Sequence, residues 1–246
     1  MKNAPAVELK RNVEEHTVVK DYYDVRAVFK KTGRAIYISH LDLMRVMQRT
    51  FKRAKLPVWF TKGYNPHIYL MFALPLSLGV SSECELMDFG IDISAGEPDY
   101  EDIKNRLNQV LPEGFEIVKL YEPKTKHTEI GACEYDVNIY SEKSPEEMLN
   151  LYDNFFAQDG IYIEKRCKVN MRKTIVTIDI KPDITLLEKH AEPDCACFSF
   201  RLPAGISHSL NIVSLTNAFE SFCGFEFDKI YIKRTRILSL TGENFT

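Results

Sequence analysis

Hydrophobic and polar residues alternate in short runs along most of the chain, while a few longer stretches repeat every three to four residues. Alternation with a period of two is typical of a half-buried strand, whereas apolar residues at i, i+3, i+4 and i+7 indicate an amphipathic helix. Residues 24–31 alternate and predict the first strand. Ser39, followed three positions later by Asp42, forms a capping-box variant, so a helix is expected to begin there and run to about Ala54, before Pro57.

The same criteria divide the chain into two similar series of elements. Residues 122–131 are polar and predict a linker between them. In the first series, strands are expected at 24–31, 57–61, 67–73, 83–93 and 115–121, with helices at 39–54 and 99–111. In the second, strands are expected at 132–140, 161–167, 173–181, 195–202 and 228–238, with helices at 145–157 and 211–223. Both series have the order β-α-β-β-β-α-β.

This repeated order predicts an α+β protein of two tandem ferredoxin-like domains, with helices on one face of each antiparallel sheet. The first domain is expected to span 23–121 and the second 132–240, on either side of the 122–131 linker. Residues 1–22 are polar and lack a sustained period, so they predict a flexible N-terminal arm. A length of 246 residues suits two domains of moderate size.

Composition narrows the class of protein. Hydrophobic residues make up 45% and charged residues 27% of the chain, which excludes a long disordered or low-complexity protein. No run of 18 apolar residues and no secretory leader is visible, so we expect a cytoplasmic protein without a membrane partner. Walker A, GxGxxG, HExxH, GxSxG and the CxxxCxxC spacing of an iron–sulfur cluster are all missing, and no cofactor is expected.

The six cysteines are scattered without CxxC pairs and predict reduced, mostly buried thiols. Cys195 and Cys197 alternate along an expected strand, which would point both thiols to one face. A metal site there is the less favoured interpretation, because no second pair lies at ligand spacing. We therefore expect no metal.

Charge is distributed unevenly. The net charge of -3 argues against a polyanionic partner, yet residues 26–67 contain ten basic residues and one acidic residue, for +9, which leaves -12 for the remainder. On the helix expected at 39–54, Arg45, Arg49 and Arg53 fall on the arc opposite the apolar residues. A solvated outer face is the ordinary explanation. The alternative is contact with phosphates or an acidic partner, because neighbouring cations repel one another.

Aromatic and histidine side chains accompany these cations. One of Trp59 and Phe60 should face away from the helices, where it could stack on a base or contact the other domain. His40 projects onto the apolar arc of its helix, where a structural role is the default, although a neutral histidine could also act as a base or metal ligand. Residues 61–67 predict a tight turn, whose geometry explains Gly63 but neither Lys62 nor His67.

Several of these residues belong to a pattern that resembles the radical SAM-linked protein family, a domain of unknown function. The similarity is specific over residues 26–93 and weaker as far as 238. It rests on Lys31, Gly33, Tyr37-Ile38-Ser39-His40-Leu41-Asp42-Leu43, Arg49, Arg53, Lys62-Gly63-Tyr64-Asn65-Pro66-His67, Leu74-Pro75-Leu76-Ser77-Leu78-Gly79, Ser82 and Glu85. Where many members carry Ser or Thr and then Gln before the turn, this chain has Thr61 and Lys62. Members of that family occur beside, or fused to, a cobalamin-binding-type radical SAM protein.

The resemblance implies a companion to a radical SAM enzyme that holds no cluster itself. The leading hypothesis is a non-catalytic accessory module that binds structured RNA or a cobalamin-type radical SAM protein. The predicted contacts are Lys31, Arg34, Arg45, Arg49, Arg53, Trp59, Lys62, Tyr64, Asn65 and His67. The alternative is an RNA-processing or RNA-modifying enzyme, with His40, His67, Asp42 and Lys62 as candidate catalytic residues. A third possibility is a homo-oligomer that associates through the Trp59 face.

A basic groove between the two domains is a further expectation. It depends on cations of the strands expected at 161–167 and 173–181, namely Arg166, Lys168, Arg172 and Lys173.

Overall fold

The computed structural model describes residues 20–169 and 172–245, and only the backbone of 166–169 and 172–173. The first half contains β1 (Tyr22–Lys31), α1 (His40–Arg53), β2 (Leu70–Phe72), β3 (Val80–Asp92), α2 (Tyr100–Val110) and β4 (Phe115–Tyr121). The second contains β5 (Ile130–Tyr140), α3 (Pro145–Ala157), β6 (Tyr162–Val169), β7 (Arg172–Asp179), β8 (Thr185–Ala191), β9 (Ala196–Pro203), α4 (Ile212–Cys223) and β10 (Lys229–Ser239). Short 3-10 helices η1 (Gly33–Tyr37), η2 (Ile93–Ala95), η3 (His127–Glu129) and η4 (Lys181–Asp183) lie between them.

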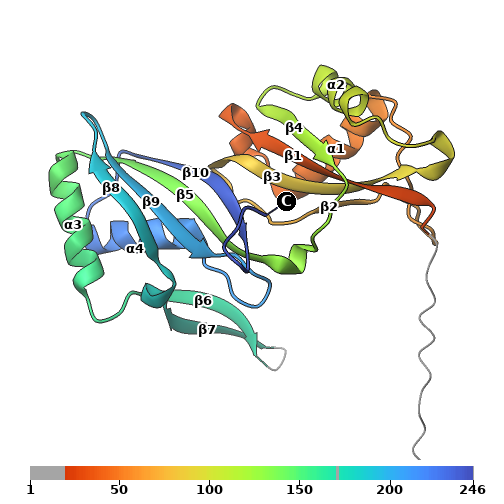
Figure 1. Ribbon diagram of the computed structural model, residues 1–246. Helices are drawn as coiled ribbons and strands as arrows, with labels where there is room; N and C mark the ends of the chain where they lie inside the picture. The colour runs from red at the N-terminus through yellow and green to blue at the C-terminus, as the bar shows by residue number, and fades with distance from the viewer. Residues whose placement is uncertain (1–19, 170–171, 246) are drawn as a thin grey trace, which may run out of the picture.

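One sheet runs through both halves (Figure 1), with the order β4-β1-β3-β10-β5-β9-β8 and β2 paired to β3. The prediction of a separate antiparallel sheet for each domain is therefore corrected. The long strand β3 extends past β1, and its residues Val80–Ser82 pair in parallel with 232–234 of β10. That parallel pairing makes the sheet mixed and joins the two halves.

Within each half, the strands follow a similar order. β4-β1-β3-β2 and β10-β5-β9-β8 each place the last strand of the half beside its first strand, and all pairs inside a half are antiparallel. The α+β class is thereby established. The ferredoxin-like description of each half, and the domain boundaries, stay predictions.

Three segments differ from the expected strands. β8 was not predicted, because it is an edge strand whose residues are exposed or only half-buried and so lack clear alternation. β6 and β7 form a separate hairpin rather than joining the main sheet, since β8 occupies the edge beside β9. Residues 57–61 make only isolated bridges, Val58 to Ile91 and Phe60 to Ile68.

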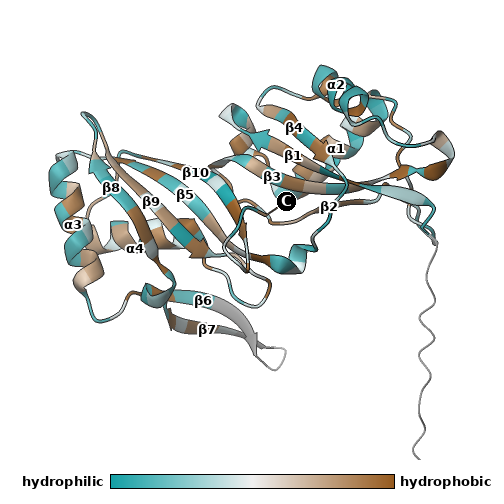
Figure 2. Cartoon of the chain, in the orientation of Figure 1, coloured by the Kyte–Doolittle hydropathy of each residue, from teal (hydrophilic) through white to brown (hydrophobic). Residues whose placement is uncertain are grey.

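Two hydrophobic cores hold the helices to the sheet. In the first, Phe51 of α1 packs on Phe89 of β3, with ring centroids 4.8 Å apart. In the second, Tyr152 of α3 contacts Phe198 of β9 and Phe219 of α4. Burial of each such side chain contributes roughly 1.5–3 kcal/mol. Hydrophobic and hydrophilic bands alternate along β5 and β9 (Figure 2). One face of these strands therefore packs on α3 and α4, and the face turned away from the helices is polar.

Within the described residues, none of the helices is both long and apolar enough to span a bilayer.

Candidate functional site

The N-terminus of α1 is fixed by the expected cap. The Ser39 hydroxyl accepts the backbone N–H of Asp42 at 3.2 Å and donates to its carboxylate at 2.7 Å, and Arg45 donates to the same carboxylate at 2.9 Å. Hydrogen bonds from Ser39, which contributes most, and from Arg45 hold the pKa of Asp42 below its usual value. The predicted start of the helix is confirmed, and Asp42 is engaged in capping it.

The outer face of α1 is cationic. Leu43, Met47, Thr50 and Phe51 turn inward, whereas the exposed positions of the last turns include Arg49, Lys52 and Arg53. At the C-terminal end, Arg106 of α2 donates to the carbonyl of Ala54, which satisfies a terminal acceptor and places another cation near the negative end of the helix dipole.

The ten basic residues of 26–67 fall into three groups. Two of them, Arg26 and Lys31, are buried. Three are paired with carboxylates: Lys30 with Glu116, Arg45 with Asp42, and Lys62 with Asp21. Five are exposed and have no ion pair within 20–169 and 172–245, namely Arg34, Arg49, Lys52, Arg53 and Lys55. These five residues form what we call the cationic set.

Lys31 does not belong to the surface, which corrects the prediction for this residue. Its side chain is 1% exposed, and its amine donates to the carbonyl of Ile38 at 2.9 Å. Burial lowers the pKa of the Lys31 amine, while the charge of Glu85 opposes that shift. The pairing of β1 with β3 shifts register between Phe29 and Lys31, and this irregularity accompanies the inward placement.

Trp59 lies on the other face of the sheet from α1. Phe89 faces the α1 core, so the next residue, Gly90, faces away. On that side the Trp59 ring packs at a tilt against the Tyr22 ring, with ring centroids 4.4 Å apart. Tyr69 adds an edge contact to the Trp59 ring at 6.0 Å. Trp59 therefore faces away from the helices, as alternation predicted for one of Trp59 and Phe60, and shares no surface with the outer face of α1.

The 61–67 turn forms a small hydrogen-bonded unit. Thr61 Oγ1 and the Asn65 carbonyl each lie 3.1 Å from His67 Nδ1, and Thr61 Oγ1 accepts the His67 backbone N–H at 3.2 Å. Lys62 pairs with Asp21 at 2.5 Å, which ties the turn to the entry of β1. Tyr64 is fully exposed at the tip.

His40 is exposed rather than buried in the apolar arc where the sequence placed it. Its ring contacts Phe72 edge-on, with centroids 5.5 Å apart. No hydrogen bond or ion pair joins His40 to His67, Asp42 or Lys62 in the described part of the chain. The four candidate catalytic residues are therefore not assembled into one hydrogen-bonded site.

Two buried ionic groups lie at and near the junction of the halves, and the sequence analysis missed both. Arg234 of β10 donates to Glu85 of β3 at 2.8 Å, and both side chains are only 4% exposed. Arg26 forms a two-pronged pair with Asp88 at 2.7 and 2.9 Å, while His127 Nε2 lies 2.9 Å from the same carboxylate. Arg234 shares the face of Ile230 and Ile232 on an alternating strand, and a charge at that apolar position was the available signal. Arg26 gave no such signal, because it lies on the face opposite the core residues Val25 and Ala27.

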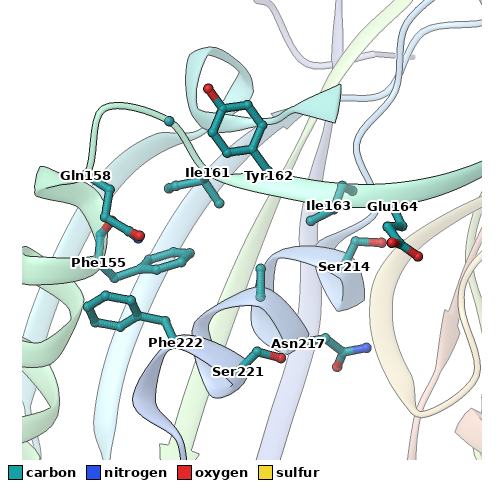
Figure 3. A pocket seen from close by; sticks show the side chains of 12 residues that line it. Phe155, Gln158, Ile161, Tyr162, Ile163, Glu164, Ser214, Asn217, Ser221 and Phe222 are labelled. Carbon is teal, nitrogen blue, oxygen red and sulfur yellow. The ribbon is translucent and has the colours of Figure 1, made fainter. Parts of the chain in front are cut away.

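Cavities lie in the second half and at its border, and two of them are lined by residues of α4. One of about 200 Å³ lies at the junction, between the 74–77 loop and the start of α4, and Arg234 lines it. The other, of about 570 Å³, lies between α4 and β6 (Figure 3), where the rings of Phe155 and Phe222 pack 5.4 Å apart and Ser214 and Ser221 line the helix side.

The side chains on which the basic groove depends lie outside the described residues. They are Arg166, Lys168, Arg172 and Lys173. That expectation stays a prediction.

These features define an α+β protein with an exposed cationic helix. Residues 25–212 match the family described as "Uncharacterized protein conserved in bacteria (DUF2344)", and the chain belongs to that family. No curated protein matches the chain.

Two solved structures show distant similarity. A chain of a Cbf5-Nop10-Gar1 complex matches with a TM-score of 0.42 and 13% identity over 87% of this chain and 49% of that one. An unknown protein from Galdieria sulphuraria matches with a TM-score of 0.23 and 14% identity over 86% of this chain and 96% of that one. Neither superposition is close enough to support a conclusion about fold or function.

Proposed function

We propose that the chain is a non-catalytic accessory module that docks structured RNA on the outer face of α1. The observation that carries the proposal is the cationic set, five exposed cations without a carboxylate partner among the described residues. A folded protein gains nothing from repulsion between Arg49, Lys52 and Arg53 at helical spacing, whereas a polyanion turns that repulsion into attraction.

The spacing of the arginines favours phosphates over isolated carboxylates. Arg49 and Arg53 of the cationic set lie four residues apart, or about 6 Å along the helix. This interval is similar to the separation of successive phosphates along an RNA strand. The planar guanidinium group also binds phosphate through two parallel hydrogen bonds.

A partner enzyme is part of the same proposal. The family resemblance implies a cobalamin-type radical SAM protein, which would hold the cluster and carry out the chemistry while this chain presents the RNA. An acidic surface of that protein is the other possible occupant of the α1 face, and the experiment below separates the two.

The experiment measures binding of total transfer RNA as a function of salt, with Arg49→Glu/Arg53→Glu compared with the wild type. Each lost phosphate contact should reduce the slope of log affinity against log salt by about 0.7–0.9, so the slope should become less steep by about 1.5. The matched control is Lys143→Glu/Lys165→Glu, which reverses two exposed cations of the second half and should leave most of the slope intact.

Failure of the wild type to bind RNA would overturn the RNA proposal. If a radical SAM protein then co-purified in a manner that depends on Arg49 and Arg53, the acidic protein surface would be the occupant instead.

Catalysis by this chain is the second candidate function, and one observation favours it. Thr61 and Asn65 hold the Nδ1 side of His67, while Nε2 of the exposed ring makes no hydrogen bond in the described part of the chain. A histidine so oriented suits proton transfer. RNA cleavage or modification lost in His67→Gln or His40→Gln, with RNA binding intact, would support the enzyme over the module.

A further inference from the structure

The turn between β8 and β9 gathers four potential metal ligands within eight residues. They are His190, Glu192, Cys195 and Cys197. β8 and β9 are antiparallel, and His190 lies directly opposite Cys197 in their register, so the two side chains share one face of the hairpin. The Glu192 N–H donates to the Cys195 carbonyl at 2.9 Å and closes the turn. The turn lies at the upper left end of the sheet in Figure 1.

Three of the four donor atoms already lie close together, and the Cys195 sulfur lies beside one of them. One ligand atom each from His190, Glu192 and Cys197 lies within 4.8 Å of the other two. His190 Nε2 is 3.8 Å from a Glu192 carboxylate oxygen, and the Cys195 and Cys197 sulfurs are 3.6 Å apart. A disulfide requires sulfurs about 2.05 Å apart, so the two thiols are held as neighbours without being bonded.

The sulfur separation of 3.6 Å is close to the one that a tetrahedral zinc ion requires. Two thiolates at about 2.3 Å from zinc, spread at the tetrahedral angle, lie about 3.8 Å apart. The donor set contains two sulfurs, one imidazole nitrogen and one carboxylate oxygen. Calcium and magnesium prefer oxygen ligands alone, whereas zinc takes all three kinds.

We propose that His190, Glu192, Cys195 and Cys197 form a zinc site at the β8–β9 turn. Four protein ligands leave no open position, so the ion would be structural: it would fasten the edge strand β8 to β9. The two cysteines alone do not make a convincing ligand set; the nearby His190 and Glu192 complete it.

The surroundings supply an entry path and a second layer of support. The two thiols are 3% and 5% exposed, whereas the His190 and Glu192 side chains are 51% and 56% exposed, so an ion can enter from the open side. A Glu188 carboxylate oxygen lies 3.5 Å from His190 Nδ1, where it can orient the ring and strengthen it as a ligand. A cleft of about 570 Å³ on the same polar sheet face leads to the site.

The test titrates the full chain, stripped of metal with a chelator, with Co²⁺ as a spectroscopic substitute for zinc. We expect one equivalent to bind, with the thiolate-to-cobalt absorption band and the visible bands of a tetrahedral ion, and zinc to displace it. His190→Gln should weaken Co²⁺ binding by about 100-fold or more, since it removes a ligand. The matched control is His208→Gln, which removes a histidine that pairs with Asp183. This variant should bind cobalt with the affinity of the wild type.

Cys197 is buried, so Cys197→Ser could fail to fold, and Glu192→Gln provides an exposed ligand variant that keeps the fold. Both the His190 and Glu192 variants should also lose the rise in Tm that zinc gives the wild type. Three results would overturn the proposal. Cobalt could bind without a thiolate band, His190→Gln could bind it with the affinity of the wild type, or the freshly purified chain could contain a Cys195–Cys197 disulfide.

Discussion

Asp88 shows at the scale of one residue how this fold uses charge. Burial raises the pKa of its carboxyl, but the hydrogen-bonded Arg26 and the adjacent His127 outweigh burial and hold this pKa below the usual value. Arg26 also donates to Thr125 and lies over the Phe245 ring, so the guanidinium is enclosed on several sides. The pair therefore depends on both partners being present.

We predict that Asp88→Asn destabilises the chain by about 3–5 kcal/mol, because Arg26 is left buried without its counter-charge. The wild type should also lose stability as the pH falls below about 4, since the folded-state pKa of Asp88 is lower than the unfolded value of about 3.9. That contribution is fully present above the unfolded pKa and disappears as the pH falls through the folded one. The variant should lack it.

Urea unfolding between pH 3 and 7 measures both effects. The control is Glu116→Gln, which breaks an exposed pair with Lys30 and should cost less than about 1 kcal/mol. An acid dependence as steep in Asp88→Asn as in the wild type would assign it to other carboxylates.

The sequence could not predict that Arg26 and Lys31 are buried. Both were counted among the ten basic residues of 26–67, because a single sequence shows the charge of a strand residue but not its partner. Arg26 lies opposite Asp88 only through the pairing of β1 with β3, 62 residues apart. The partner of a buried charge depends on contacts between residues far apart in the sequence. By contrast, exposed helix positions such as Arg49 can be predicted from local periodicity.

At the scale of elements, the packing over Gly90 supports the start of β1. A Cβ at this position would lie 2.9 Å from the Tyr22 ring and 3.1 Å from the Trp59 Cβ. Neither contact is tolerated without movement. The absence of a side chain at Gly90 therefore leaves room for the two tilted rings to pack against each other.

We predict that Gly90→Ala costs about 1–3 kcal/mol by overpacking and changes the fluorescence of Trp59, the only tryptophan. A Tyr22→Ala background removes the nearest ring, so the same substitution should cost less there. A double-mutant cycle measures the difference. Equal costs in both backgrounds would mean that the Tyr22 ring is not the obstacle.

The helices were the most predictable elements, because their caps and apolar periods are local. α1 begins after Ser39 and α3 after Ser144, each with its cap in place, close to the predicted bounds. The strands were less predictable where their position depends on neighbours. β8 shows no pattern of its own because an edge strand is only partly covered, and only pairing decides that β6 and β7 stand apart.

At the scale of the whole molecule, the net charge of -3 is a poor guide to binding surfaces. Pairing and burial remove half of the cations of 26–67 from the surface balance, and the cationic set is what remains. The sequence could predict that a basic face exists on α1, since amphipathic spacing is local. Alternation also predicted that one of Trp59 and Phe60 faces away from the helices, but it could not predict that Trp59 is the one, because this depends on how the chain folds around β3.

The two halves are coupled through a short junction. Three residue pairs join β3 to β10, and beside them Arg234 binds Glu85 and the carbonyls of Leu74 and Pro75, all from the first half. Because these groups are buried, loss of Arg234 leaves Glu85 without its main counter-charge and several carbonyls without a donor. The wild type should therefore unfold as one cooperative unit.

We predict that Arg234→Met separates the unfolding of the two halves. Trp59 fluorescence reports the first half alone, whereas far-ultraviolet circular dichroism reports both, and their midpoints should coincide in the wild type and diverge in the variant. The control Arg236→Met, on the same strand but 48% exposed, should keep the midpoints together. Coincident transitions in Arg234→Met, with only a uniform loss of stability, would show that apolar contacts such as those of Val80 and Leu86 carry the coupling instead.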